Sequence, residues 1–185
     1  MKNSSTIYRT LPRHDSQRPS AVTIGNFDGV HRGHQAILAR VRQTALERGL
    51  ASAVMTFSPH PRAFFALRGR RPELVPTQIN SLRDKLSTLA RHGIEQIALQ
   101  RFDHRLADMS AEDFIGRLLV GGLNTRWLLV GEDFRYGHKR SGDIELLRRS
   151  GREYGFEVET IADVADEHGH RISSSELRTA LAVGN

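Results

Sequence analysis

The sequence predicts an α/β protein, with a Rossmann-like, mainly parallel sheet that carries helices on both faces and forms a single domain. Three observations predict this fold. Short apolar segments alternate along the chain with longer amphipathic segments, which is the order expected of strand–helix units. The strand segments are largely apolar, as in parallel sheets that helices cover on both faces. Distinctive motifs follow directly after predicted strands, at the place where such folds bind ligands.

In the first half of the chain the clearest element is an amphipathic helix at 32–48. It places Ile37, Leu38 and Val41 on one face, and Gly49 ends it. The elements expected around it are a strand at 21–27, a strand at 51–57, a short helix around 64–67, a helix at 81–92 and a strand at 94–99.

The second half continues the alternation. Its expected elements are a helix at 111–120, a strand at 127–130, a helix at 143–154, a strand at 156–161 and a last helix from about 174 to 183. Residues 1–20 are polar and are expected to add only a short edge strand around 7–9. The predicted organisation is therefore a polar segment at 1–20 followed by one domain at 21–185.

The composition is that of a globular protein with a basic balance. The 185 residues carry a net charge of +6, with a sequence pI of about 10.4. The positive charges are spread along the chain, which favours an anionic small substrate over nucleic acid. The sequence has no cysteine, no apolar run of the roughly 18–20 residues that span a membrane and no apolar signal near residue 1. We therefore expect a cytoplasmic protein with no membrane partner and no nucleic-acid partner.

The most informative motif is GNFDGVHRGH, from Gly25 to His34. It lies where the first strand gives way to the first helix. Glycines at such a turn let backbone N–H groups approach a ligand closely, and the start of a helix carries a partial positive charge. His31 and His34 are three residues apart, so both can face one ligand. The motif predicts a binding site for a nucleotide polyphosphate.

Three further motifs follow in order: TFSPHPRAFF at 56–65, LLVGEDFRYGHKRSGD at 128–143 and RISSSELRTALAVGN at 171–185. Together with GNFDGVHRGH they resemble the FAD synthetase module, the FMN adenylyltransferase half of bacterial bifunctional riboflavin kinase/FMN adenylyltransferases. The first and last motifs belong to the wider HxGH nucleotidyltransferase superfamily, and the middle two are more specific. The resemblance implies transfer of AMP from ATP to FMN by direct in-line displacement. FAD and pyrophosphate are the implied products, and Mg²⁺ accompanies ATP.

The resemblance places the ATP site in the first, third and last motifs. His31, His34 and Arg178 are implied to be catalytic, because imidazole and guanidinium groups suit phosphate oxygens. The implied ATP-binding residues are Gly25, Phe27, Asp28, Gly33, Asp133, Arg171, Ser174 and Ser175. Three structural alternatives stay open here. Asp133 also fits a glycine-bounded loop with a helix cap. Asp28 is also the residue type that stabilises a turn, and serines at a helix start are ordinary caps.

The resemblance places the flavin site in the second motif, at Pro59, Arg62, Phe64 and Phe65. Arginine suits the FMN phosphate and phenylalanine suits the isoalloxazine ring. The two phenylalanines are equally compatible with a place in the core. The remaining histidines lack the spacing of metal ligands, so no zinc site is expected and no residue is assigned to a metal. Mg²⁺ can be held by protein carboxylates or by phosphates and water alone.

The last motif ends the chain where the family continues into a riboflavin kinase barrel. We therefore expect no riboflavin kinase domain here and a separate riboflavin kinase that supplies FMN. Two alternatives remain at this point. One is a nucleotidyltransferase with another phosphate acceptor, against which the middle motifs argue. The other is a protein that binds flavin nucleotides without turnover, against which the complete set of His31, His34 and Arg178 argues.

Overall fold

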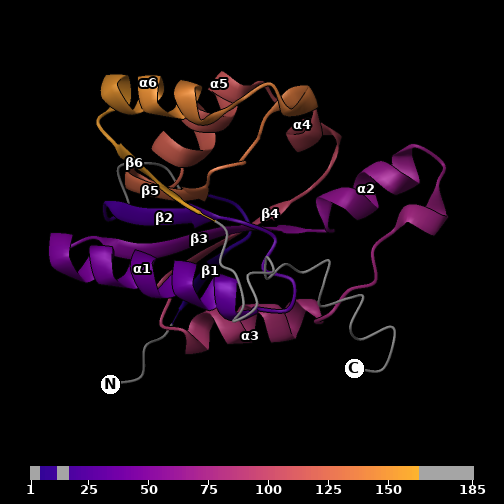
Figure 1. Ribbon diagram of the computed structural model, residues 1–185, viewed down its shortest axis with the longest axis horizontal. Helices are drawn as coiled ribbons and strands as arrows, with labels where there is room; N and C mark the ends of the chain where they lie inside the picture. Colours follow the sequence, from indigo (N-terminus) through magenta and orange to yellow (C-terminus); the bar gives the residue numbers. More distant parts are fainter. Residues whose placement is uncertain (1–4, 12–16, 163–185) are drawn as a thin grey trace.

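A six-stranded parallel sheet forms the centre of the computed structural model, which describes residues 5–11 and 17–162 (Figure 1). Its strands are β1 (Thr6–Tyr8), β2 (Ser20–Ile24), β3 (Ala51–Ser58), β4 (Gln96–Arg101), β5 (Thr125–Gly131) and β6 (Glu157–Ile161). Their order across the sheet is β1-β4-β3-β2-β5-β6, and each pairs with its neighbours in parallel. The predicted parallel sheet is confirmed, including the short edge strand near residue 7.

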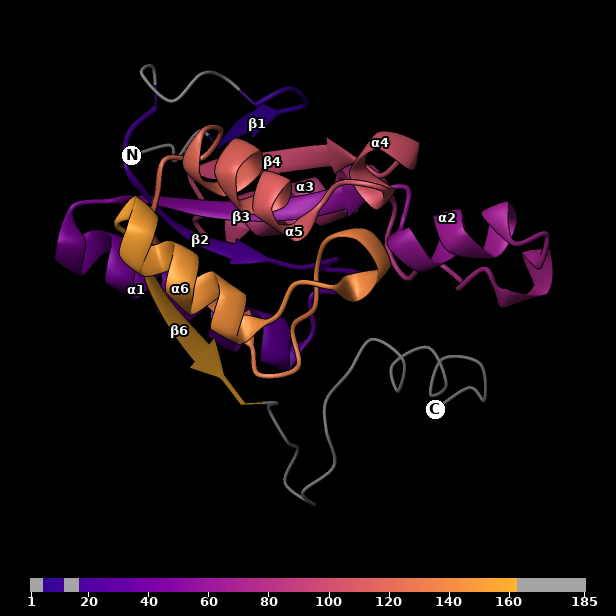
Figure 2. The ribbon, with the colours of Figure 1, turned by 90° about the horizontal axis from the view of Figure 1, so that it is seen from above.

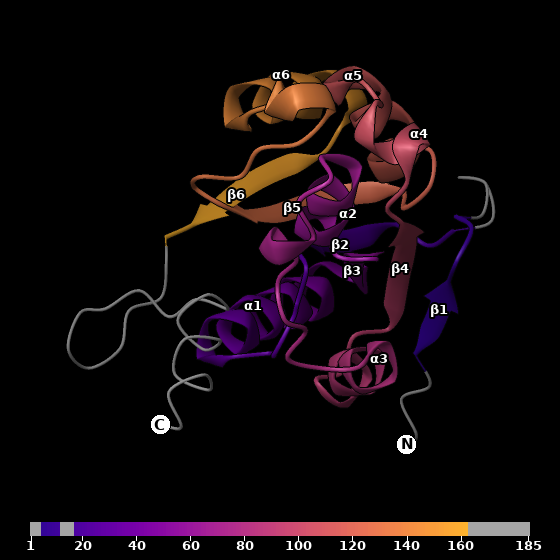
Figure 3. The same cartoon turned by 90° about the vertical axis from the view of Figure 1, so that its right-hand side faces the viewer.

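Helices cover both faces of this sheet (Figures 1 and 3). On one face lie α1 (Arg32–Arg48) and α3 (Leu82–Arg91), and on the other lie α4 (His104–Ala107), α5 (Ala111–Asp113) and α6 (Ile144–Tyr154). The helix α2 (Pro61–Arg68) projects beyond the carboxyl ends of the strands (Figure 2). Two short 3₁₀ helices, η2 (Pro72–Leu74) and η4 (His138–Arg140), lie in the loops. Within the described residues, no helix combines the length and apolar character that a membrane crossing requires.

The strands are buried because alternate side chains pack against opposite helical layers. Along β2, Ala21 belongs to the apolar cluster under α1 and α3, whereas Val22 and Ile24 belong to the cluster on the α5 and α6 side. Trp127 on β5 is 1% exposed and lies on the α1 side. This two-sided burial is the reason that the strands read as apolar runs without a polar alternation.

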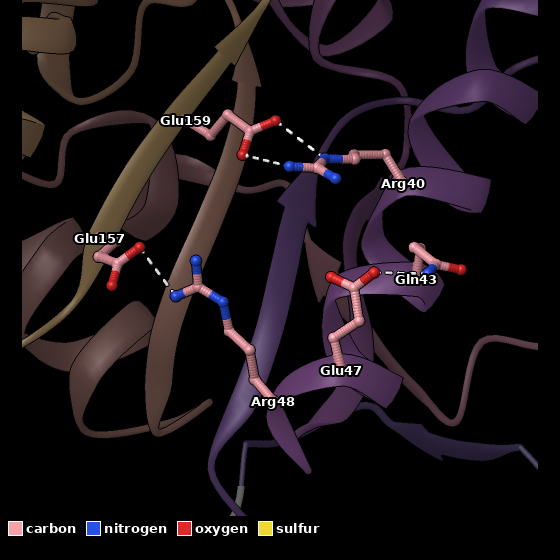
Figure 4. A network of polar contacts seen from close by, with 6 residues as sticks. All are labelled: Arg40, Gln43, Glu47, Arg48, Glu157 and Glu159. Atoms are coloured by element: carbon pink, nitrogen blue, oxygen red, sulfur yellow. Dashed lines mark hydrogen bonds and ion pairs between the residues drawn. The ribbon is translucent and has the colours of Figure 1, made fainter.

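Polar contacts join the edge strand β6 to α1 (Figure 4). The guanidinium group of Arg40 donates two hydrogen bonds of 2.9 Å to the carboxylate of Glu159. Arg48 pairs with Glu157 at 2.8 Å. Since both pairs link α1 to the same strand, they tie the helix that begins at the histidine motif to the far edge of the sheet.

The structure corrects several predicted element boundaries. The first strand ends at Ile24 and not at residue 27, because Phe27 has a φ of 49°, which no strand continues through. The helix expected at 111–120 is α-helical only over α5 and continues as a π-helix, η3 (Phe114–Val120). Its N–H groups bond five residues back, as Gly121 N does to Gly116 O at 2.9 Å. The last predicted helix lies outside the described residues.

Candidate active site

The strand order reverses between β2 and β5, and this point defines the site. From β2 the chain builds β3 and β4 on one side, then crosses over to build β5 and β6 on the other. In open α/β sheets such a switch point leaves a crevice at the carboxyl ends of the strands. A cleft of about 780 Å³ opens there, and Gly25 after β2 and Asp133 after β5 both line it.

The loop after β2 makes a sharp turn into α1. Gly25 N still donates to Met55 O at 3.0 Å, so the loop starts as an extension of the sheet. Phe27 then turns with a positive φ and buries its ring to 1% exposure. A Cβ on Gly25 would lie 2.9 Å from that ring, so glycine is required for this packing. Gly25 and Phe27 therefore shape the turn. Their role in binding ATP stays a prediction.

His31 and His34 lie together at the start of α1. His31 is the N-cap residue, with extended backbone angles of −76° and 174°. The two imidazole rings stack with their centroids 3.8 Å apart, and the Phe27 ring lies 4.9 Å from that of His34. The first N–H groups of a helix have no partner within it. The predicted pair of histidines is thus brought to a helix N-terminus that favours an anion.

The electrostatics of this pair keep His34 neutral. Burial lowers the pKa of His34 to about 3, and the neighbouring His31 contributes to this lowering. A hydrogen bond to the backbone of Gly29 and the charge of Asp28 act in the opposite direction. Nδ1 of His34 is buried and bonds to no described residue. This nitrogen is a polar atom of the site that a ligand can still satisfy.

Asp28 has a structural role that the sequence left open. It is 6% exposed, and its Oδ1 accepts hydrogen bonds from the backbone N–H groups of Ile79 at 3.1 Å and Asn80 at 3.3 Å. The carboxylate therefore braces the motif loop against the segment that leads into α3. Its charge also acts on His34, as described above. Gly33, the remaining member of the motif, is buried in the first turn of α1.

Two of the predicted flavin residues line the cleft. Arg62 and Phe65, both on α2, belong to its wall, and Phe65 is 51% exposed. Phe64 is absent from the lining, and its ring centroid lies 5.2 Å from that of His104. Both phenylalanines contact Phe102, with ring centroids 5.4 Å (Phe64) and 5.7 Å (Phe65) from it. Pro59 follows Ser58 through a cis peptide bond at the end of β3, outside the cleft lining. The flavin role of these residues stays a prediction.

The remaining predicted residues cannot be placed. Arg171, Ser174, Ser175 and Arg178 lie outside the described residues. Within the described part of the chain, no group of three or more histidine, cysteine or carboxylate side chains gathers to hold a metal ion.

Several lining residues were not predicted. They are apolar or aromatic side chains near the strand ends and in the loops after them, together with Asn26 and the basic residues of η4. These unpredicted lining residues are Asn26, Phe57, Phe102, Leu106, Phe114, His138, Lys139 and Arg140. Asn26 and Phe57 lie in the last two residues of predicted strands and Phe102 lies three residues after one, so the switch-point rule was the available signal. Leu106 and Phe114 have no such signal, because apolar residues in helices normally belong to the core.

The described structure has a Rossmann-like fold with a cleft at its switch point, and solved structures share this fold. Among solved structures, a pantothenate synthetase from Thermus thermophilus superposes with a TM-score of 0.54 at 16% identity, over 90% of this chain and 66% of that chain. A pantoate-beta-alanine ligase from Francisella tularensis gives a TM-score of 0.58 at 12% identity, over 98% and 77% of the two chains. A structure described as a macrolide-efflux protein from Streptococcus pneumoniae gives 0.76 at 26% identity, over 96% and 57%.

The chain belongs to the FAD synthetase family, whose model matches residues 13–176. A bifunctional riboflavin kinase/FMN adenylyltransferase from Pseudomonas fluorescens is 41% identical over 179 residues, which are 97% of this chain and 54% of the relative. The protein of the same description from Escherichia coli (strain K12) is 43% identical over 169 residues, which are 91% and 52%. The chain thus spans about half the length of these relatives and matches their FMN adenylyltransferase half.

Proposed function

We propose that this chain is an FMN adenylyltransferase. A phosphate oxygen of FMN attacks the α-phosphorus of ATP, and the bond from that phosphorus to the leaving pyrophosphate breaks, giving FAD. The observation that carries the proposal is one of position. In a chain that matches the FAD synthetase model, the loop after β2 lines a cleft of about 780 Å³ through Gly25 and Asn26. The same loop leads to the stacked histidine pair at the start of α1, which is not itself part of the cleft lining.

This chemistry needs alignment and charge stabilisation, with no covalent enzyme intermediate. In our proposal His31, His34 and the N-terminus of α1 bind the phosphates of ATP, with His34 at the oxygens that gain charge in the transition state. Asp133 accepts hydrogen bonds from the adenosine, and Gly25, which lines the same cleft, lies next to the bound nucleotide. Arg62 binds the FMN phosphate and Phe65 packs on the isoalloxazine ring. Arg171, Ser174, Ser175 and Arg178 complete the phosphate site, as the resemblance implies.

Mg²⁺ enters this proposal with the nucleotide, as MgATP. FMN comes from a riboflavin kinase, an activity that the matched relatives combine with adenylyl transfer in one chain by their descriptions. The test incubates the purified chain with FMN, ATP and Mg²⁺ and follows FAD by chromatography, with riboflavin plus ATP beside it. FAD formed from FMN supports the proposal. If the chain binds FMN but forms no FAD, it is a non-catalytic flavin carrier. If it neither binds FMN nor forms FAD, the phosphate acceptor is a different molecule.

The Asp28→Asn variant is expected to leave the Mg²⁺ dependence of the rate unchanged. Asparagine keeps the Oδ1 acceptor that bonds Ile79 and Asn80, so the brace to α3 is retained while the negative charge is lost. The measurement is the rate of FAD formation against Mg²⁺ concentration at fixed ATP. A several-fold higher Mg²⁺ requirement in the variant would contradict this expectation and place Asp28 next to the metal.

The Phe65→Ala variant is expected to raise the KM for FMN by roughly 3- to 10-fold, with the KM for ATP unchanged. The reason is the loss of one aromatic contact with the flavin, worth about 0.5–1.5 kcal/mol. Leu67→Ala is the matched control, since Leu67 lies on the same helix, is 60% exposed and is absent from the cleft lining. Equal effects of the two substitutions on the KM for FMN would remove Phe65 from the flavin site.

A further inference from the structure

One lysine reaches from α3 to the end of β3 and the loop after β2. Lys85 lies in the first half of α3, and its Nζ donates hydrogen bonds to Asn26 O at 3.1 Å and to Phe57 O at 3.0 Å. Thr56 Oγ1 lies 3.4 Å from the same Nζ and itself donates to Asn26 O at 3.1 Å. The three protons of the ammonium group therefore have three acceptors. All three belong to the ends of β2 and β3 or the loop that follows.

The two carbonyl groups that Lys85 joins lie where the sheet stops. Beyond the bond from Gly25 N to Met55 O, the chain after β2 turns away, so carbonyls there lose their ladder partners. Asn26 and Phe57 both line the cleft. Unpaired buried carbonyls are costly. The ammonium group supplies the donors that a neighbouring strand would otherwise provide, and so it links the loop after β2 to the end of β3.

Lys85 and Asp28 form a reciprocal brace. Asp28, on the motif loop, bonds to the backbone just before α3, and Lys85, on α3, bonds to the backbone of the motif loop. Between these two contacts the loop has little freedom to shift. The same loop continues within a few residues into His31 and His34, so its placement sets the placement of the imidazole rings.

The charge of Lys85 is kept at some cost. Burial lowers the pKa of Lys85 below its ordinary value, and the nearby carboxylate of Asp28 opposes this effect. A partly buried cation is unfavourable unless its hydrogen bonds are satisfied. The ammonium group therefore places a positive charge against the backbone carbonyl of Asn26, within the motif that predicts the polyphosphate site.

We propose that Lys85 is a positioning residue for adenylyl transfer, acting through the carbonyl groups of Asn26 and Phe57 to hold the motif loop and its two histidines in place. The inference rests on the proposed function for its reaction. Lys85 is absent from the cleft lining, so its effect passes through the backbone that it binds.

The test compares Lys85→Met, Lys85→Arg and the control Arg83→Met, which removes an exposed cation from the same helix. The kcat is measured at saturating FMN and MgATP, at a temperature where unfolding curves show each variant fully folded. We expect Lys85→Met to lower kcat roughly 10- to 100-fold, because small misplacements of aligned groups have effects of this size. Lys85→Arg should recover most of the loss, and Arg83→Met should stay within about twofold of wild type, as expected of an exposed residue away from the site.

A folded Lys85→Met variant with a wild-type kcat and a lower unfolding temperature would overturn the inference and leave Lys85 a stabilising residue only. If Lys85→Met does not fold, Lys85→Leu, which also removes the donors, is judged by the same criterion. NMR signals of the His31 and His34 rings give a second readout, expected to shift in Lys85→Met and not in Arg83→Met. If the wild-type chain forms no FAD, the proposed function fails, and these signals alone decide whether Lys85 positions the loop.

Discussion

Replacing His34 by alanine is expected to lower the kcat of FAD formation by about 10²–10³-fold, the loss seen when one donor to a charged transition state is removed. Bound phosphates favour the protonated form of His34, in which both ring nitrogens donate. The affinity for FMN should change little, because the proposed flavin residues lie on α2 and not on α1. The reason for the large effect is geometric. His34 is held by stacking on His31 and by the Phe27 ring, and its Nδ1 bonds to no residue in the described structure.

Two further variants sharpen this prediction. His34→Asn carries a side-chain amide near the position of Nδ1 and should retain more activity than His34→Ala. His92→Ala is the matched control. His92 caps the end of α3 just before β4 begins, so it lies near the amino ends of the strands, whereas the candidate site lies at their carboxyl ends. The measurements are steady-state rates and FMN binding by fluorescence. A His34→Ala variant with a kcat close to that of the wild type would show that this imidazole does not act on the reacting phosphate.

The second large effect is a loss of stability in acid. His34 has a pKa of about 3 in the folded chain and an ordinary value of 6.5 when unfolded. Between these values the unfolded state binds more protons, so the free energy of unfolding falls as the pH falls from 6.5 toward 3. Over the acid range from neutral pH to about pH 4, this group alone should remove on the order of 3 kcal/mol.

The His34→Asn variant isolates this contribution. Asparagine does not titrate, so the stability of the variant should fall less steeply below pH 6.5 than that of the wild type. Urea unfolding at a series of pH values measures both curves, with His92→Asn as the control for loss of another histidine. Parallel curves for wild type and His34→Asn would mean that the imidazole is protonated in the folded chain at ordinary acidity.

Much of the fold follows from local patterns in the sequence. Burial on two faces forces strands such as 51–58 to be largely apolar, and the amphipathic run at 32–48 matches α1 residue for residue. Strand and helix ends were less predictable. The first strand stops short of residue 27 because Phe27 has a positive φ, and the helix that begins as α5 continues as the π-helix η3. Both depend on how the chain packs in three dimensions.

The glycine-rich loop and its two histidines were evident in the sequence, because their chemistry depends on residues close together in the chain. Phe64 and Phe65 could not be separated in the same way. Adjacent residues on a helix point in different directions. Both rings contact Phe102, and only the position of α2 decided that Phe65 lines the cleft while Phe64 packs on His104.

By itself, then, the sequence determined the parallel α/β architecture, the family and the loop that carries the histidines, since periodicity and motif are local properties. The tertiary structure alone decided the partners of Asp28 and Lys85. Each bonds to backbone that is about 30–60 positions away in the chain. In the sequence Lys85 is one cation on an amphipathic helix, indistinguishable from Arg83. Only the packing of α3 beneath the ends of β2 and β3 turns one of the two inward, where burial and three hydrogen bonds give it a specific role.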